Sequence, residues 1–338
     1  MACGRVALER AGIQVDSYHA FEIDKYAIQI STKNYPDIVE LGDIQGWQNH
    51  LDEIGIPDLL IAGSPCQGFS NAGKGLNFDD LRSKLFFVFV DILNYYRAKN
   101  PNLKFLLENV RMKKEWQDVI TSYVGVEPVK INSSLVSAQN RIRLYWTNFP
   151  ITQPQDKKLV LADIIDCGYV DREKSYTIDA NYAKGGNHRS YFEDGKRQLV
   201  FGAAIRNLVT NRGIEEQLNI RKDNKSNCVV PTYPSKLNGL IFAGMADDIN
   251  GLDINRRIDS SIGKAPALST MQVGHRQPKV VLDLSHYRKL TPLECERLQT
   301  LSDNYTEGVS NSQRYKMIGN GWTVDVIAHI FTEMVASS

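Results

Sequence analysis

A buried strand that ends in a cysteine-bearing loop constrains this sequence more than any other feature. The apolar run Pro57 to Ala62 is typical of a parallel strand covered on both faces, and it breaks into the loop Gly63-Ser64-Pro65-Cys66-Gln67-Gly68-Phe69-Ser70. Cys66 would therefore lie at the carboxyl end of the strand, the edge at which open α/β sheets bind ligands. A lone cysteine is usually a small buried hydrophobe. The proline before it and the polar segment after it instead favour a thiolate nucleophile.

Two further strands carry charged residues toward the same edge. The run Phe105 to Leu107 ends in Glu108, which is a solvated charge in the ordinary case but could act as a proton donor beside a nucleophile. In the segment Gln139 to Trp146, Arg141 and Arg143 share one strand face at a period of two. Such a pair suits either an edge strand with solvated arginines or a site that holds a carboxylate or phosphate.

The alternation of apolar patterns predicts an α/β fold with a doubly wound, mostly parallel sheet. Helices are expected at Ala27 to Asn34, Leu81 to Arg97, Lys113 to Tyr123 and roughly Val324 to Val335. With 338 residues and 42% hydrophobic content, the chain can bury one catalytic domain and a smaller one. We expect the first domain at 1–150, a separate lobe at 151–287, and a C-terminal segment at 288–338 that returns to the first domain.

The central lobe is more basic than the rest of the chain. Residues 151–287 hold 19 Lys plus Arg against 16 Asp plus Glu, a difference of +3, and residues 196–236 alone reach +5 from eight basic and three acidic residues. Such a surface is either ordinary solvated charge or a face that contacts phosphates. The five cysteines are scattered, so neither structural zinc nor a disulfide framework is expected. The longest apolar runs, such as Leu85 to Leu93, are too short to span a bilayer.

These motifs together resemble the cytosine-5 DNA methyltransferases of prokaryotes and phages. The shared segments follow the family's order and spacing: Pro65 to Ser70, Glu108-Asn109-Val110, Gln139 to Arg143, Arg288 to Gln299, and Gly319-Asn320-Gly321. Several motifs in register are far less frequent by chance than one short pattern. The resemblance implies the fold of S-adenosylmethionine-dependent methyltransferases, with 151–287 as a target-recognition domain.

The same resemblance implies a mechanism. Cys66 would add to carbon 6 of a cytosine so that carbon 5 attacks the methyl group, while Glu108 would contact ring nitrogen 3 and the exocyclic amine. Arg143 would contact the base, and Arg141 would support the loop or the backbone. Substrate-binding positions of the family are matched by Gln67, Ser70, Asn109 and Gln139. Since a stacked base is out of reach, the cytosine would be flipped out of duplex DNA.

S-adenosylmethionine is the methyl donor that the resemblance implies, with no metal. Glu22 matches the position that binds the ribose hydroxyls, as an acidic residue after the second strand commonly does, and Ile23 matches the residue that packs on adenine. Asp43 and Ile44 match the segment that reads the adenine amine. Other positions that match the donor site are Gly4, Gly63, Pro65, Leu85 and Asn320.

One departure from the family concerns the beginning of the sequence. The family begins with a strand and a glycine-rich turn of the form Leu-Phe-x-Gly-x-x-x-Gly, and this sequence starts within that turn at Met1-Ala2-Cys3-Gly4. In the family the strand lies in the middle of the sheet, so its five or so apolar side chains represent roughly 8–15 kcal/mol of burial. We therefore expect weakened donor binding and an impaired activity.

Two other interpretations stay open. A tRNA cytosine-5 methyltransferase would use the same fold, and a catalytically impaired DNA-binding fragment of the family would keep the motifs without turnover. The segment Gln67 to Ser70 and the long central lobe favour double-stranded DNA as the partner. We further expect a monomer in the cytoplasm, at a bacterial nucleoid or in a phage-infected cell, with a cognate restriction endonuclease as a candidate partner.

Overall fold

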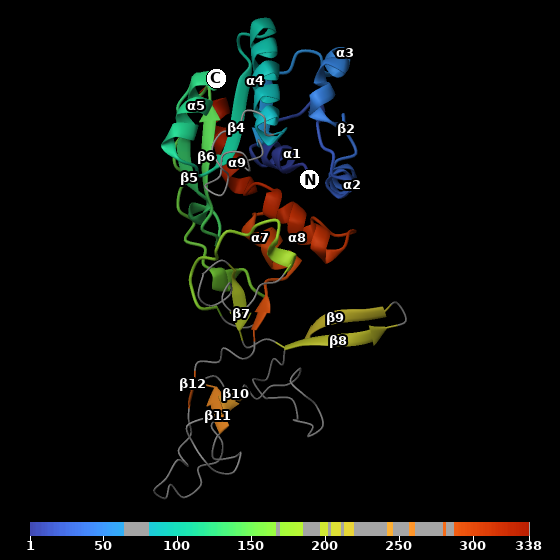
Figure 1. Ribbon diagram of the computed structural model, residues 1–338, viewed down its shortest axis with the longest axis vertical. Helices are drawn as coiled ribbons and strands as arrows, with labels where there is room; N and C mark the ends of the chain where they lie inside the picture. The colour runs from blue at the N-terminus through green and yellow to red at the C-terminus, as the bar shows by residue number, and fades with distance from the viewer. Residues whose placement is uncertain are drawn as a thin grey trace, which may run out of the picture. The chain divides into compact units, whose positions relative to one another are not determined.

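The computed structural model describes residues 1–63, 81–166, 170–184, 197–201, 204–210, 213–219, 242–245, 257–260, 280–281 and 287–337 (Figure 1). The chain forms two compact units. The first comprises Met1–Ile164, Lys174–Asn187 and Pro292–Ser338, and the second comprises Ile165–Glu173 and His188–Thr291. Residues 151–164 and 174–187, which we expected in the central lobe, thus belong to the first unit. Pro65, Cys66, Gln67 and Ser70 lie outside the described residues.

A four-stranded sheet forms the centre of the first unit. Its order is β3 (Leu59–Gly63), β4 (Lys104–Val110), β6 (Ile142–Thr147) and β5 (Val129–Asn132). Strands β3 and β4 are parallel, whereas β6 is antiparallel to both β4 and β5. The α/β class predicted from the sequence is confirmed, and the sheet is mixed because β5 and β6 form an antiparallel pair beside the parallel strands.

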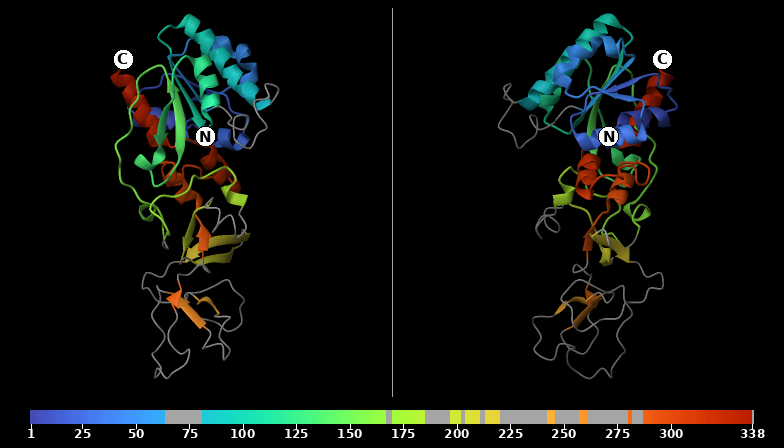
Figure 2. Two further views of the ribbon diagram at one scale, coloured as in Figure 1. Left: turned by 60° about the vertical axis from the view of Figure 1, so that its left-hand side comes forward. Right: turned by 90° about the vertical axis from the view of Figure 1, so that its right-hand side faces the viewer.

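Successive residues of β4 alternate between two apolar cores, as the period of a strand requires. Phe105 and Leu107 belong to the core built with α4 (Leu81–Lys99) and α5 (Lys114–Val124). Leu106 between them belongs to the core built with α1 (Cys3–Arg10) and α9 (Val324–Ala336). The helices therefore cover both faces of the sheet, and α2 (Lys25–Asn34), α4, α5 and α9 confirm the helices expected from the sequence (Figure 2).

A second, two-stranded sheet belongs to the same unit. Strand β1 (Tyr18–Ala20) runs parallel to β2 (Ile38–Glu40). Among the described residues no ladder joins β1 to β3. Strands β1 and β3 instead line one cavity of about 810 Å³, which Met1 also lines. The turn after β2 continues into the 3-10 helix η1 (Ile44–His50) and the short helix α3 (Leu51–Ile54).

The C-terminal segment returns to the beginning of the chain. Helix α9 packs against α1, and Asp325 at its start lies 2.5 Å from Arg10 and 2.6 Å from Lys157. Helices α7 (Pro292–Leu298) and α8 (Asn311–Asn320) precede it. The turn between α8 and α9 places Asn320, Gly321 and Trp322 at the cavity described above.

The described part of the second unit consists of short strands, several of them visible in Figure 2. They form three small sheets: β7 (Leu199–Phe201) with β13 (Tyr287–Lys289), β8 (Ala204–Thr210) with β9 (Gly213–Asn219), and β10 (Phe242–Met245) with β11 (Arg257–Ser260) and β12 (Val280–Val281). The first two sheets are antiparallel.

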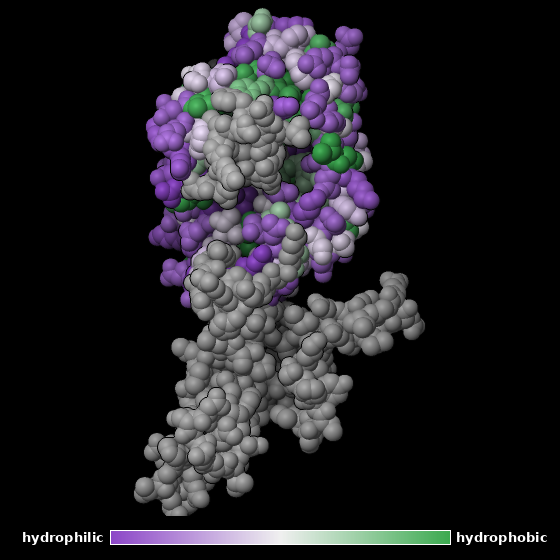
Figure 3. All heavy atoms as spheres, viewed as in Figure 1, coloured by the Kyte–Doolittle hydropathy of each residue, from purple (hydrophilic) through white to green (hydrophobic). Residues whose placement is uncertain are grey.

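The visible face of the first unit is mainly hydrophilic, with small and separate hydrophobic patches (Figure 3). Among its described residues, the exposed large hydrophobic side chains are far apart in the sequence: Ile23, Ile56, Tyr123 and Val335. Within the described ranges, no helix combines the length and the apolar character needed to cross a membrane.

Candidate active site

Glu108 lies where the two parallel strands of the main sheet end together. It is the third-to-last residue of β4, near the carboxyl end of the strand, and it is buried. In the parallel ladder its partner is Gly63, the last residue of β3. The sequence prediction that two strand ends converge is therefore confirmed for β3 and β4.

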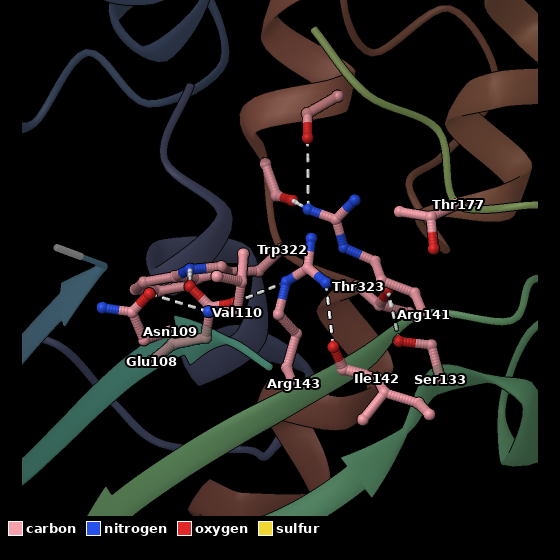
Figure 4. A network of polar contacts seen from close by, with 12 residues as sticks. Glu108, Asn109, Val110, Ser133, Arg141, Ile142, Arg143, Thr177, Trp322 and Thr323 are labelled. Carbon is pink, nitrogen blue, oxygen red and sulfur yellow. Dashed lines mark hydrogen bonds and ion pairs between the residues drawn. The ribbon is translucent and has the colours of Figure 1, made fainter. Parts of the chain in front are cut away.

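Both carboxylate oxygens of Glu108 have a partner in the protein (Figure 4). Nε of Arg143 lies 2.9 Å from Oε1, and Nε1 of Trp322 donates a hydrogen bond to Oε2 at 3.1 Å. The Arg143 guanidinium is oriented further by a bond from Nη1 to the carbonyl of Ile142, at 2.9 Å. The side chains of Arg143 and Glu108 are only 13% and 11% exposed, so this charge pair is largely shielded from solvent.

Arg141 has a different set of partners, although it is only two residues away. Its buried guanidinium donates hydrogen bonds to the carbonyls of Ile178, Gly319 and Gly321, at 2.8, 3.1 and 2.9 Å. Burial lowers the pKa of Arg141 to about 10. These contacts fix the turn that contains Asn320, and in this structure Arg143 alone of the two arginines contacts Glu108.

Two amides expected to bind substrate are buried within the protein. Gln139 accepts a hydrogen bond from the backbone N–H of Ile178 at 2.8 Å and donates one to the carbonyl of Leu298 at 3.2 Å. Asn109 accepts one from the N–H of Val110 at 2.8 Å. Their positions favour a role in holding the strands and the C-terminal segment together. Gln67 and Ser70, the other two expected contacts, fall outside the described residues.

The cavity of about 810 Å³ collects most of the residues expected to bind a methyl donor. Gly4, Glu22, Ile44, Gly63, Leu85 and Asn320 line it. Ile23 is 77% exposed, and neither it nor Asp43 is among the lining residues. Pro65 lies outside the described residues. A volume of this size suits a nucleoside-sized ligand.

The acidic side chains near the cavity are oriented by backbone donors. One oxygen of Glu22 accepts hydrogen bonds from the N–H groups of Ile23 and Asp24, both at 2.9 Å. Asp43 caps η1 by accepting from the N–H of Gln45 at 2.9 Å. Because Oε1 of Glu22 accepts both of these bonds, its second oxygen is the one suited to a ligand's hydroxyl groups.

Metal chemistry has no candidate centre in the part of the chain that the structure describes. No group of three or more His, Cys, Asp and Glu side chains there is placed to hold a metal ion. The two described cysteines, Cys3 and Cys295, are buried, and burial raises the pKa of the Cys3 thiol. Neither of them has the exposure of a nucleophile.

Trp322 was not among the residues expected at this site. Its indole reaches Glu108 from the turn between α8 and α9, which is far from β4 in the sequence. The available signal was its position directly after Gly319-Asn320-Gly321, where a large aromatic residue follows a turn matched to the donor site.

Solved structures of methyltransferases share this fold, and two of them illustrate the likeness. The methyltransferase EhMeth of Entamoeba histolytica has a TM-score of 0.60 at 16% identity and covers 99% of this chain and 94% of its own. The DNMT2 mutant of Spodoptera frugiperda also has a TM-score of 0.60 at 16% identity, covering 98% and 96%. The chain therefore has the fold of these methyltransferases.

Sequence comparison identifies the family. The model described as C-5 cytosine-specific DNA methylase matches residues 2–119 and 133–336, and the chain belongs to this family of transferase enzymes. The type II methyltransferase M.NlaX of Neisseria lactamica is 28% identical, over 98% of this chain and 93% of that protein. The orphan methyltransferase M.SPRI of Bacillus phage SPR is 26% identical, over 97% and 94%. The resemblance of the motifs is thus confirmed.

Proposed function

We propose that this chain transfers a methyl group from S-adenosylmethionine to carbon 5 of a cytosine flipped out of duplex DNA, through a covalent adduct with Cys66. The observation that carries the proposal is the meeting of Glu108 and Arg143 at the ends of β3 and β4, beside a cavity of nucleoside size. Membership of the family supports DNA as the substrate.

Chain geometry supports Cys66 as the nucleophile of this site. Cys66 follows Gly63 by three residues, and three residues of extended chain reach at most about 11 Å. Gly63 is the ladder partner of Glu108. This chain length permits Cys66 and Glu108 to act on one base, as the proposed nucleophile and acid must.

The proposed steps assign one task to each side chain. The Cys66 thiolate forms a bond to carbon 6, and Glu108 hydrogen-bonds ring nitrogen 3 and the exocyclic amine, which draws electrons so that carbon 5 becomes nucleophilic. S-adenosylmethionine, when bound, would supply the electrophilic methyl group for carbon 5 and would leave as the neutral thioether. A base then removes the proton from carbon 5, and the carbon–sulfur bond breaks to release the thiolate. Arg143 holds Glu108 throughout.

The cavity supports the choice of donor. Glu22 presents a carboxylate that two backbone N–H groups orient, as a group that accepts ribose hydroxyls requires. Ile44 supplies an apolar surface suited to adenine, and Asn320 lies on the turn that Arg141 fixes. The residues present thus combine polar and apolar lining in the way a nucleoside with a charged tail needs.

Comparing two nucleic acids tests the substrate. Purified protein with tritium-labelled S-adenosylmethionine is expected to label duplex DNA that contains cytosine and to leave tRNA unlabelled. The basic central lobe, with its net charge of +3 over residues 151–287, is consistent with contacts to the DNA phosphates. Labelling of tRNA alone would show that the substrate is tRNA and not DNA. Labelling of neither nucleic acid would favour a catalytically impaired DNA-binding protein of the family.

The Glu108→Gln variant tests the role of the carboxylate. An amide can still hydrogen-bond the base, but it cannot donate a proton to ring nitrogen 3, so the single-turnover rate is expected to fall by about 10²–10⁴-fold. DNA affinity should change by much less. Glu115→Gln, at an exposed position in the first turn of α5, is the matched control and should keep the wild-type rate. A wild-type rate for Glu108→Gln would make that residue structural.

A further inference from the structure

Trp322 makes the contact at the site that neither the motifs nor the proposed mechanism assigns. It lies in the turn between α8 and α9, and its indole N–H is one of the two donors to Glu108. Figure 4 shows the ring beside Glu108, with Arg143 approaching the same carboxylate. Two donors of different kinds therefore define the position of this carboxylate: a charged guanidinium on Oε1 and a neutral indole on Oε2.

The ring is also packed against the end of β3. A Cβ atom added at Gly63 would lie 3.0 Å from Nε1 and 3.3 Å from Cζ2 of Trp322, and 3.4 Å from Oε2 of Glu108. On another side, a Cβ at Gly4 would lie 3.5 Å from Cζ3 of the same ring. The glycine at position 63 thus leaves room for the indole at the end of β3, whereas a Cβ at Gly4 would be at ordinary contact distance from the ring.

Trp322 also lines the cavity, together with Gly4, Gly63 and Asn320. A single side chain therefore contacts the carboxylate with its N–H and forms part of the cavity wall with its ring. The same ring thus touches both the cavity expected for the methyl donor and the group expected to act on the base.

We propose that Trp322 is a positioning residue for methyl transfer: its indole N–H holds Glu108 in place, and its ring fixes the distance between the donor cavity and that carboxylate. This inference rests on the proposed function, because Glu108 must act on the base for its position to matter. The indole donates to Oε2 and leaves the remaining acceptor sites of the carboxylate to the base.

The Trp322→Phe variant separates the N–H from the ring. Phenylalanine keeps an aromatic ring against Gly63 but cannot donate to Glu108. We expect kcat for duplex DNA to fall by roughly 10-fold or more, the loss typical of a hydrogen bond to a charged group. The KM for S-adenosylmethionine should stay within about twofold, since the wall of the cavity is kept. Equal kcat for Trp322→Phe and wild type would overturn the proposal.

Trp146→Phe provides a matched control. Its indole also donates one hydrogen bond of 3.1 Å, to Oγ1 of Thr121, but it is fully buried on the opposite face of the sheet from Glu108, as the ladder partner of Leu107. This variant should melt at a lower temperature than wild type and keep the wild-type kcat per folded molecule. A fall in kcat as large as that of Trp322→Phe would show a general structural effect and overturn the positioning role.

A double-mutant cycle between Gly63 and Trp322 tests the packing of the indole on β3 and needs no measurement of activity. The added methyl group meets the indole at 3.0 Å, so Gly63→Ala should lower the melting temperature by several degrees in the wild-type background. In the Trp322→Val background the ring is gone, and the same change should cost much less. An equal cost in both backgrounds would overturn the contact on which the proposal depends. If the cycle gives the expected coupling but the wild-type protein transfers no methyl group, the packing contact stands and the proposed function is overturned. The positioning role of Trp322 in methyl transfer would then be overturned with it.

Discussion

Cys66→Ser is expected to abolish methyl transfer, with a loss of about 10⁴-fold or more, because catalysis by a nucleophile fails when the nucleophile is removed. A serine hydroxyl is far less ionised near neutral pH than a cysteine thiol, whose ordinary pKa is about 8.5. Serine differs from cysteine by one atom and leaves the basic residues of the central lobe unchanged, so affinity for duplex DNA is expected to stay close to wild type. Tritium transfer and a gel-shift titration on the same preparations measure the two effects.

A mechanism-based trap tests the same residue by the formation of a product instead of a loss of activity. Duplex DNA that contains 5-fluorocytosine should form a covalent adduct with the wild-type protein, since fluorine at carbon 5 cannot leave as a proton does and the thioether persists. The adduct should be absent with Cys66→Ser and present with Cys228→Ser, a matched substitution in the central lobe. An adduct formed by Cys66→Ser would assign the nucleophile to another residue.

The parts of the site that the sequence predicted are those that depend on local pattern. An apolar run followed by a polar residue marks the end of a buried strand, and this placed Glu108 beside the end of β3 before any pairing was known. The helices followed from their periodicity in the same way, and α4 begins at Leu81 as expected. Signals of this kind lie within a window of ten residues or so and need no knowledge of the tertiary fold.

The partners of the two arginines could not be predicted by the same reasoning. A period of two places Arg141 and Arg143 on one face, but the acceptors of Arg141 are backbone carbonyls 37, 178 and 180 residues away. Every residue has a carbonyl, so such an acceptor leaves no mark in the sequence. The indole of Trp322 and the carboxylate of Glu108 are 214 residues apart, so no local pattern could pair them.

The sequence motifs also could not show which amide side chains form hydrogen bonds within the protein instead of with a substrate. Gln139 belongs to a motif that resembles a substrate-binding segment, yet both ends of its amide bond to backbone groups from the C-terminal half of the chain. At this position a residue of the motif has a structural role within the protein. Among the described residues expected at the site, Arg143 and Glu108 contact each other, and most of those expected to bind the donor line the cavity.

The second large effect is expected from adding a strand ahead of Met1. Strands β1 and β3 belong to separate parallel pairs, and both line the cavity that Met1 also lines. An apolar strand of five residues that ends in a Phe-x-Gly turn could pair with both edges. Burial of its side chains would contribute about 8–15 kcal/mol, against an ordering cost of about 5–10 kcal/mol. A net gain of a few kcal/mol should raise the melting temperature on the order of 10 °C.

The same extension is expected to tighten donor binding, because a glycine turn completed ahead of Gly4 would let the backbone approach the ligand, which side chains elsewhere cannot replace. Calorimetry with S-adenosylmethionine on the two chains measures this directly. An extension with proline at its central position is the matched control: it keeps the apolar character but removes a ladder donor, so most of both gains should disappear. If all three chains melt alike and bind the donor alike, the two parallel pairs are stable without a strand between them, and the cavity between β1 and β3 belongs to the working enzyme.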